Sequence, residues 1–209
     1  AMAAEVAASA SADTAAVMAI ETTGELTTVA EAEVAADGTF TVSGVGELAA
    51  PFVVETRAAG EVVGRVLVTT DASATAAVKI LPVSHETTVE AEAYLSLIAS
   101  GESDASIDAI GLMMRITAET ASHADDAASI GASAHAALTA EAAVAGSDAQ
   151  QMESAKVEAW AELTAAVHAG GSEADAWSNF MGRVHADVAA ETGASLQTIA
   201  TATAAGNAA

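Results

Sequence analysis

The sequence predicts an α+β protein in which an N-terminal antiparallel β-sandwich is followed by an alanine-rich helical bundle of about five helices. Between residues 13 and 83, apolar and polar positions alternate in short runs, which is typical of strands with one buried face. From residue 84 onward the apolar positions follow a helical period. We therefore expect a sandwich domain at 13–83, a helical domain at 84–209, and an N-terminal extension at 1–12.

Turn residues separate the predicted strands. Asp37-Gly38 predicts a tight hairpin turn that leads into Phe40 and Val42. Pro82 marks the end of the last strand. The expected strands lie near residues 17–20, 25–35, 40–42, 52–57, 61–68 and 76–83. Several short strands at this spacing favour a sandwich.

Capping residues and glycines divide the second domain into helices. Thr87 with Glu90 forms a candidate capping box. Further helices are expected to start at Ser103 or Asp104, near residue 126, at Ser147 and at Ser172, with a short last one around Leu196 and Ile199. Trp160 and Trp177 fall on the apolar stripes of adjacent helices, so we expect a core contact between them rather than a ligand platform.

Charge and composition exclude several classes of protein. The chain carries 29 acidic and 6 basic side chains, a net charge of −23, which excludes nucleic-acid binding because phosphates would be repelled. The hydrophobic fraction of 52% is inflated by alanine, and no run is long enough for a membrane-spanning helix, so no membrane insertion is expected. With no cysteine, the chain has neither disulfides nor thiolate chemistry.

Histidines and carboxylates are the candidate ligands for a metal. The five histidines are His85, His123, His135, His168 and His185, and none lies in a HExxH pattern. A zinc site built from them is weighed against solvated or helix-terminal histidines, and the second interpretation is preferred. Carboxylates that could bind calcium are Glu102, Asp104, Asp108, Asp125 and Asp126. Because they match no known calcium loop, we favour solvated acidic helix starts, and no metal or cofactor site is assigned.

Catalytic motifs are also missing from the sequence. There is no glycine-rich phosphate loop and no GxSxG elbow, and the glycines at 44, 46, 60 and 64 are interpreted as turns or bulges. Serines and histidines could in principle form a triad, but any chain of this composition offers them. We expect that the protein is not an enzyme, with no catalytic residue assigned.

Residues 13–81 resemble the carboxypeptidase-regulatory-like domains, transthyretin-like β-sandwiches of secreted bacterial proteins. The likeness rests on the stretch from Val34 to Val42 around Asp37-Gly38, on the strand that begins at Phe52, and on the Gly60–Gly64 hairpin. The resemblance implies an extracellular spacer, adhesion or folding module and carries over no catalytic residue. Residues 84–209 resemble no family.

These observations lead to an expected function. The chain starts Ala1-Met2-Ala3 without a charged leader, which we interpret as an exported protein whose signal has been removed. We expect a structural subunit of an extracellular or cell-surface filament or assembly, with other copies of itself as the partner. Residues 1–12 are the candidate donor strand for the sheet edge of another copy. The alternative is a monomeric periplasmic or surface binding module that holds a small ligand or calcium in a groove between the two domains.

Overall fold

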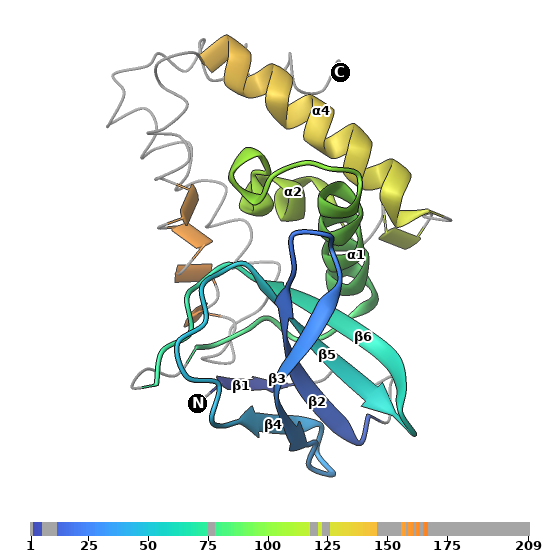
Figure 1. Cartoon of the computed structure of the whole chain (residues 1–209), viewed down its shortest axis with the longest axis vertical. Coiled ribbons are helices and arrows are strands. Elements are labelled where there is room, and N and C mark those ends of the chain that lie inside the picture. The colour runs from blue at the N-terminus through green and yellow to red at the C-terminus, as the bar shows by residue number, and fades with distance from the viewer. Residues whose placement is uncertain are drawn as a thin grey trace.

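The computed structural model describes residues 2–5, 12–74, 78–117, 121–122 and 126–145, together with helical residues at 156–157, 159–160, 162–163 and 165–166. Its centre is a four-stranded antiparallel sheet in the order β3-β2-β5-β6 (Figure 1). The strands are β2 (Thr14–Ile20), β3 (Leu26–Glu33), β5 (Phe52–Ala58) and β6 (Glu61–Val68). Valine, alanine and phenylalanine dominate the two central strands, β2 and β5, whose residues are mostly buried.

Two short strands form a second sheet. β1 (Met2–Glu5) pairs antiparallel with β4 (Thr39–Val42), and neither is hydrogen-bonded into the four-stranded sheet. β4 packs against β2 and β3, so the two-stranded sheet lies beside the first half of the larger one (Figure 1). We call this pair the β1–β4 sheet.

Helices cover the other end of the molecule. α1 (His85–Ala99) packs against β6 and against α4 (Ala127–Ala145), while α2 (Ala109–Arg115) contacts both helices. A 3-10 turn, η1 (Asp104–Ser106), precedes α2. No helix in the described part of the chain is both long and apolar enough to cross a bilayer.

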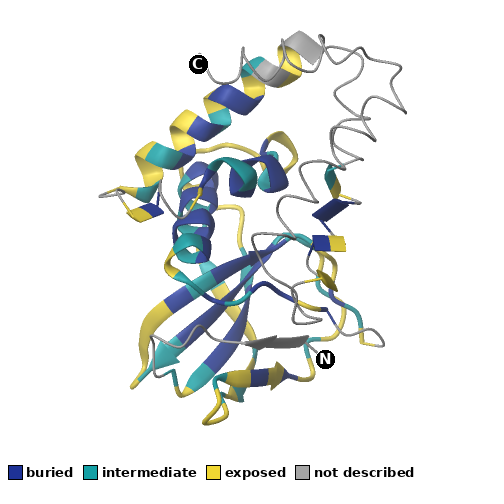
Figure 2. Ribbon diagram, turned by 180° about the vertical axis from the view of Figure 1, so that it is seen from behind, coloured by how far each residue is buried: buried dark blue, intermediate teal, exposed yellow. Residues whose placement is uncertain are grey.

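A continuous core joins the sheet to the helices. Buried residues run along β2, β5 and β6 and continue into the inner sides of α1 and α2 (Figure 2). Its largest buried side chains come from both regions and include Phe52, Tyr94, Leu112 and Met113. One hydrophobic core is thus shared by the sheet and the helices of the described part of the chain.

The predicted β-sandwich followed by about five helices is wrong. The individual strands near 17–20, 25–35, 40–42, 52–57 and 61–68 are present, but four of them share one sheet, the strand near 40–42 pairs with β1, and α1 packs against β6. The strand predicted at 76–83 is not formed by residues 78–83, whose main chain makes only isolated bridges. Their apolar side chains are nevertheless buried. Period-two alternation shows that a strand has a buried face, but not whether a sheet or a helix covers it.

The helical prediction needs corrections of its own. Three α-helices have described bounds, and further helical residues between 156 and 166 lie in the stretch where a helix was predicted from Ser147. The helices predicted from Ser172 and around Leu196 lie outside the described residues. The capping box of α1 is formed by Ser84 and Thr87, not by Thr87 and Glu90. Residues 103–117 do not form one helix, because Ile107 adopts an extended conformation and Asp108 caps a new helix by accepting a hydrogen bond from the Gly111 amide at 2.7 Å.

Candidate functional site

The β1–β4 sheet is the feature that bears most directly on self-association, and a defined turn positions its inner strand. The Gly38 amide donates to the Ala35 carbonyl at 2.9 Å, and Gly38 has a φ of +84°. The Asp37 carboxylate accepts hydrogen bonds from the Thr39 hydroxyl at 2.7 Å and the Thr39 amide at 3.0 Å. These two bonds, the hydroxyl first, lower the pKa of Asp37 below its ordinary value. The sequence therefore fixes the start of β4 locally.

The turn at Asp37-Gly38 was expected to join two paired strands, and this part of the prediction is wrong. β3 and β4 belong to different sheets, so the turn redirects the chain from one sheet to the other. The Ala35 amide still donates to the Thr39 carbonyl at 2.8 Å, but the ladder does not continue beyond it. β4 is left with one strand partner, β1.

Main-chain pairing holds β1 in place. Four consecutive residue pairs join the strands, from Met2 opposite Val42 to Glu5 opposite Thr39. On β4 the exposure alternates, since Phe40 and Val42 are buried at 4% and 0% while Thr39 and Thr41 are exposed. β4 is therefore anchored to the core through Phe40 and Val42, and it packs against β2 and β3 as well as β1.

The candidate donor strand is thus formed, but it pairs with a strand of its own chain. The sequence predicted that part of residues 1–12 could add to a sheet edge of another copy, and the structure pairs residues 2–5 with β4 of the same molecule. Nothing in the sequence of β4 alone identified it as the acceptor, because a four-residue strand has no long alternation. The observed pairing identifies β1 as the donor strand and β4 as the acceptor strand of the contact.

The outer edge of β3 is poorly suited to pair with another strand. Val17 lies opposite Ala30 and Met18 opposite Thr28, which leaves Val29 as a bulge in β3. The exposed carboxylates Glu31 and Glu33 follow on the same strand. Bulges and charges are the usual protections of an edge strand against association.

The outer edge of β6 is covered by the chain that leads into α1. Ser84 forms an antiparallel bridge with Arg65, and the Arg65 amide donates to the Thr88 hydroxyl at 3.0 Å. A Cβ atom at Gly64 would lie 2.4 Å from Cγ1 of Val83, so glycine is needed for this close approach. The β6 edge is therefore covered around Arg65, and the β3 edge carries a bulge and two exposed glutamates.

A network of charged side chains crosses one face of the four-stranded sheet. Glu55, only 3% exposed, accepts from Arg57 at 2.9 Å and from Arg65 at 2.9 Å. Arg57 also contacts Glu31 at 3.1 Å, and Arg65 contacts Glu92 of α1 at 3.0 Å. The network links β3, β5, β6 and α1, and it matches each guanidinium with two carboxylates. This arrangement supports a structural role for Arg57 and Arg65, two of the six basic residues of the chain.

The two histidines in the described part of the chain lie in separate contacts. His85 Nε2 lies 3.1 Å from the Ala121 carbonyl, and His135 Nε2 lies 3.6 Å from a Glu102 carboxylate oxygen. The remaining histidines, His123, His168 and His185, lie outside the described residues. The two described histidines therefore make separate contacts, His85 at the start of α1 and His135 in the middle of α4.

The carboxylates proposed as calcium ligands are occupied by different partners. Asp104 accepts from the buried Tyr94 hydroxyl, and burial together with this bond raises the pKa of Tyr94. Asp108 pairs with Lys156 and caps α2, while Asp126 accepts from the Ser129 hydroxyl at 2.6 Å at the start of α4. Asp125 lies outside the described residues. Within the described ranges, no three such side chains are close enough together to hold a metal ion.

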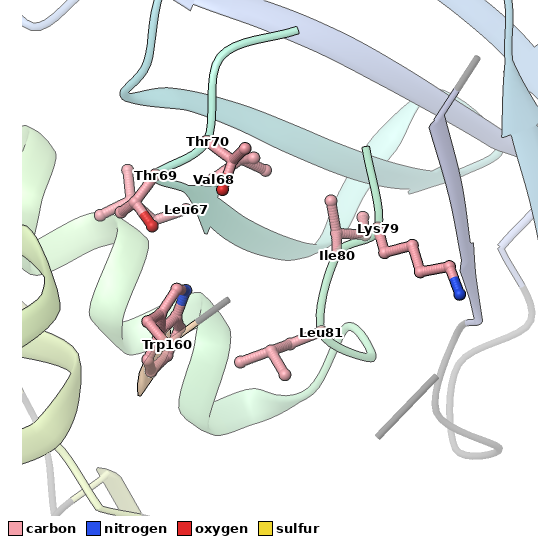
Figure 3. Close-up of a pocket in the computed structure, with 8 residues that line it drawn as sticks. All are labelled: Leu67, Val68, Thr69, Thr70, Lys79, Ile80, Leu81 and Trp160. Atoms are coloured by element: carbon pink, nitrogen blue, oxygen red, sulfur yellow. The ribbon is translucent and has the colours of Figure 1, made fainter. Parts of the chain in front are cut away.

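A small pocket lies where the end of β6 meets the chain before α1. Thr69, Leu81 and Trp160 surround it, and the Lys79 side chain points away (Figure 3). Its enclosed space has room for about one water molecule, whereas pockets for small ligands are roughly 300–1,000 Å³. Trp160 is buried at 5%, as the core interpretation predicts, but its expected partner Trp177 lies outside the described residues.

Comparison of the chain with protein-family models, with curated proteins and with solved structures found no match. The candidate site therefore rests on the geometry of this chain alone.

Proposed function

We propose that this chain is a self-associating structural subunit of an extracellular or cell-surface assembly. The observation that supports the proposal is the β1–β4 sheet, in which a four-residue strand is held beside the main sheet by one strand partner. Two-stranded sheets are marginal by themselves and gain stability when further strands are added. Main-chain pairing at such a sheet joins protein copies without requiring a side-chain pocket.

The contrast with the larger sheet strengthens the proposal. The β3 edge carries a bulge with two exposed glutamates, and the β6 edge is covered by the chain that leads into α1. Proteins protect edges in this way when association there would be harmful. Association through strand pairing is then directed to the β1–β4 sheet.

The charge of the chain fits a role in exposed surroundings. At −23, copies repel one another at low ionic strength, because the Debye length is about 10 Å in 0.1 M salt and about 3 Å in 1 M salt. Salt screens this repulsion, so the assembled state is favoured by high ionic strength. In the finished assembly the remaining charge limits non-specific clumping.

Light scattering combined with electron microscopy tests the proposal. The purified chain is measured at low and high salt, with and without calcium, and we expect particles well above the 20.4 kDa chain mass at high salt. A monodisperse 20.4 kDa species under all four conditions would refute self-association. The control replaces the exposed Val62 and Val63, 41% accessible each and located on β6, by serine. This control should associate as the unaltered chain does, since general surface hydrophobicity is not the cause.

A further inference from the structure

We infer that the copies associate by exchanging β1, so that β1 of one copy pairs with β4 of a second copy in the register seen within one chain. This inference rests on the proposed function and adds to it the donor, the acceptor and the register. The competing possibility is simple addition, in which each β1 stays on its own β4 and the copies meet edge to edge.

The acceptor strand is built to stay in place when β1 leaves. Phe40 and Val42 are buried in the core at 4% and 0% exposure, and the Asp37–Thr39 hydrogen bonds hold the preceding turn. The Asp37–Thr39 hydrogen bonds involve no residue of β1, and β4 also packs against β2 and β3. The edge of β4 that β1 covers thus persists as a preformed template of main-chain donors and acceptors.

The donor strand has little that commits it to its own chain. It has four residue pairs with β4 and is hydrogen-bonded to no other strand of the described part. An exchanged β1 re-forms the same four pairs on the second copy, so the exchange conserves the pairing. Domain swapping of this kind is a low-cost route to association, because the hydrogen bonds that break within each chain form again between chains.

The covalent connection is long enough for exchange. Residues 6–13 join β1 to β2, which starts at Thr14 in the middle of the large sheet. Eight residues can span at most roughly 26–29 Å when fully extended, about twice the radius of gyration of roughly 13 Å that a domain of about 100 residues has. A neighbouring copy in contact can therefore receive β1 without any change in the four-stranded sheet. Reciprocal exchange closes a two-fold dimer, whereas one-way exchange produces an open chain.

Cysteine pairs across the β1–β4 register distinguish exchange from simple addition. The chain contains no cysteine, so any disulfide in the mixture must join introduced cysteines. Ala3 lies opposite Thr41, and residues opposite each other in an antiparallel pair have Cα atoms about 4.5–5.5 Å apart, within the range that disulfides bridge. Chains carrying Ala3→Cys are mixed with chains carrying Thr41→Cys at high salt and are oxidised. Neither variant can form an intrachain disulfide.

Two controls accompany the mixture. A chain that carries both substitutions, oxidised when dilute, should form the intrachain disulfide and thereby confirms the fold and the register. Ala3→Cys mixed with Thr27→Cys, an exposed position on β3, should give no disulfide between the two variants. If the first pair disturbs folding, Glu5→Cys with Thr39→Cys tests the same register from the other end of the strands.

The outcomes separate the inference from the proposed function. A disulfide-linked species of twice the 20.4 kDa chain mass, formed by the Ala3 and Thr41 variants but not by the control mixture, is the expected result. Large particles without this species overturn the exchange and leave self-association standing. A monomer at every salt and protein concentration overturns both.

Discussion

Replacing Glu55 by glutamine should cost more stability than the same change at Glu92, the exposed carboxylate that binds Arg65 in the same network. The carboxylate is 3% exposed and accepts from two guanidinium groups, each at 2.9 Å. A hydrogen bond to a charged group contributes about 1.5–3 kcal/mol, and the glutamine carbonyl retains one of them. Because the two arginine side chains are 23–24% exposed, water screens part of the lost attraction. We expect a loss of about 2–3 kcal/mol in the free energy of unfolding.

Urea unfolding followed by circular dichroism measures this loss, with Glu92→Gln as the matched control. Glu92 binds the same Arg65 at 3.0 Å, but its side chain is 42% exposed. Exposed ion pairs contribute about 0–1 kcal/mol, so the control should stay close to the unaltered protein. If Glu55→Gln loses no more stability than Glu92→Gln, the network does not join the sheet to α1 in the way described.

Three further predictions concern turns and helix contacts. Ala59→Asn should stabilise the protein by about 1 kcal/mol. Ala59 has a φ of +51° in the turn before Gly60, and asparagine adopts this left-handed conformation more readily than alanine does. An unchanged or lower melting temperature would contradict this. Gly111→Ala should destabilise the protein by about 1–3 kcal/mol. The reason is that the new Cβ would lie 2.3 Å from the Asp108 carboxylate and 2.6 Å from a Leu138 methyl carbon. Urea unfolding tests this, and wild-type stability would show that α2 packs against α4 less closely than described. Asp37→Asn should lower stability near neutral pH but not in strong acid. The reason is that the pKa of Asp37 is lowered on folding, so its contribution is present above its ordinary value of 3.8 and is lost as the pH falls through the folded value. Thermal unfolding between about pH 5 and about pH 2 should show the two proteins converging, and a constant difference would contradict the assignment.

Local patterns in the sequence predicted much of the secondary structure. The alternation of Ala30, Ala32 and Val34 with glutamates located β3, and the stripe around Val89 and Leu97 located α1, because both depend on the solvent exposure of one face. The charged network was not predicted. Glu55, Arg57 and Arg65 look like ordinary solvent-facing strand residues, and only the registry of β5 with β6 shows that they meet.

The sandwich was mispredicted for a reason that the residues make clear. Val78, Ile80, Leu81 and Val83 form an apolar run that resembles a strand, yet they are buried in the common core without forming one. The candidate site was foreseen only in part. Residues 1–12 were predicted as a candidate donor strand, but the identity of β4 as the partner depends on the long-range pairing of Met2 with Val42.

The role of β1 in association is tested most directly by removing it. Sedimentation equilibrium at high salt compares the unaltered chain with one that lacks residues 1–11, while circular dichroism verifies that both are folded. Because β4 also packs against β2 and β3, the shortened chain should fold, and without a donor strand it should sediment as a monomer while the unaltered chain forms larger species. Equal association of the two folded proteins would contradict the account.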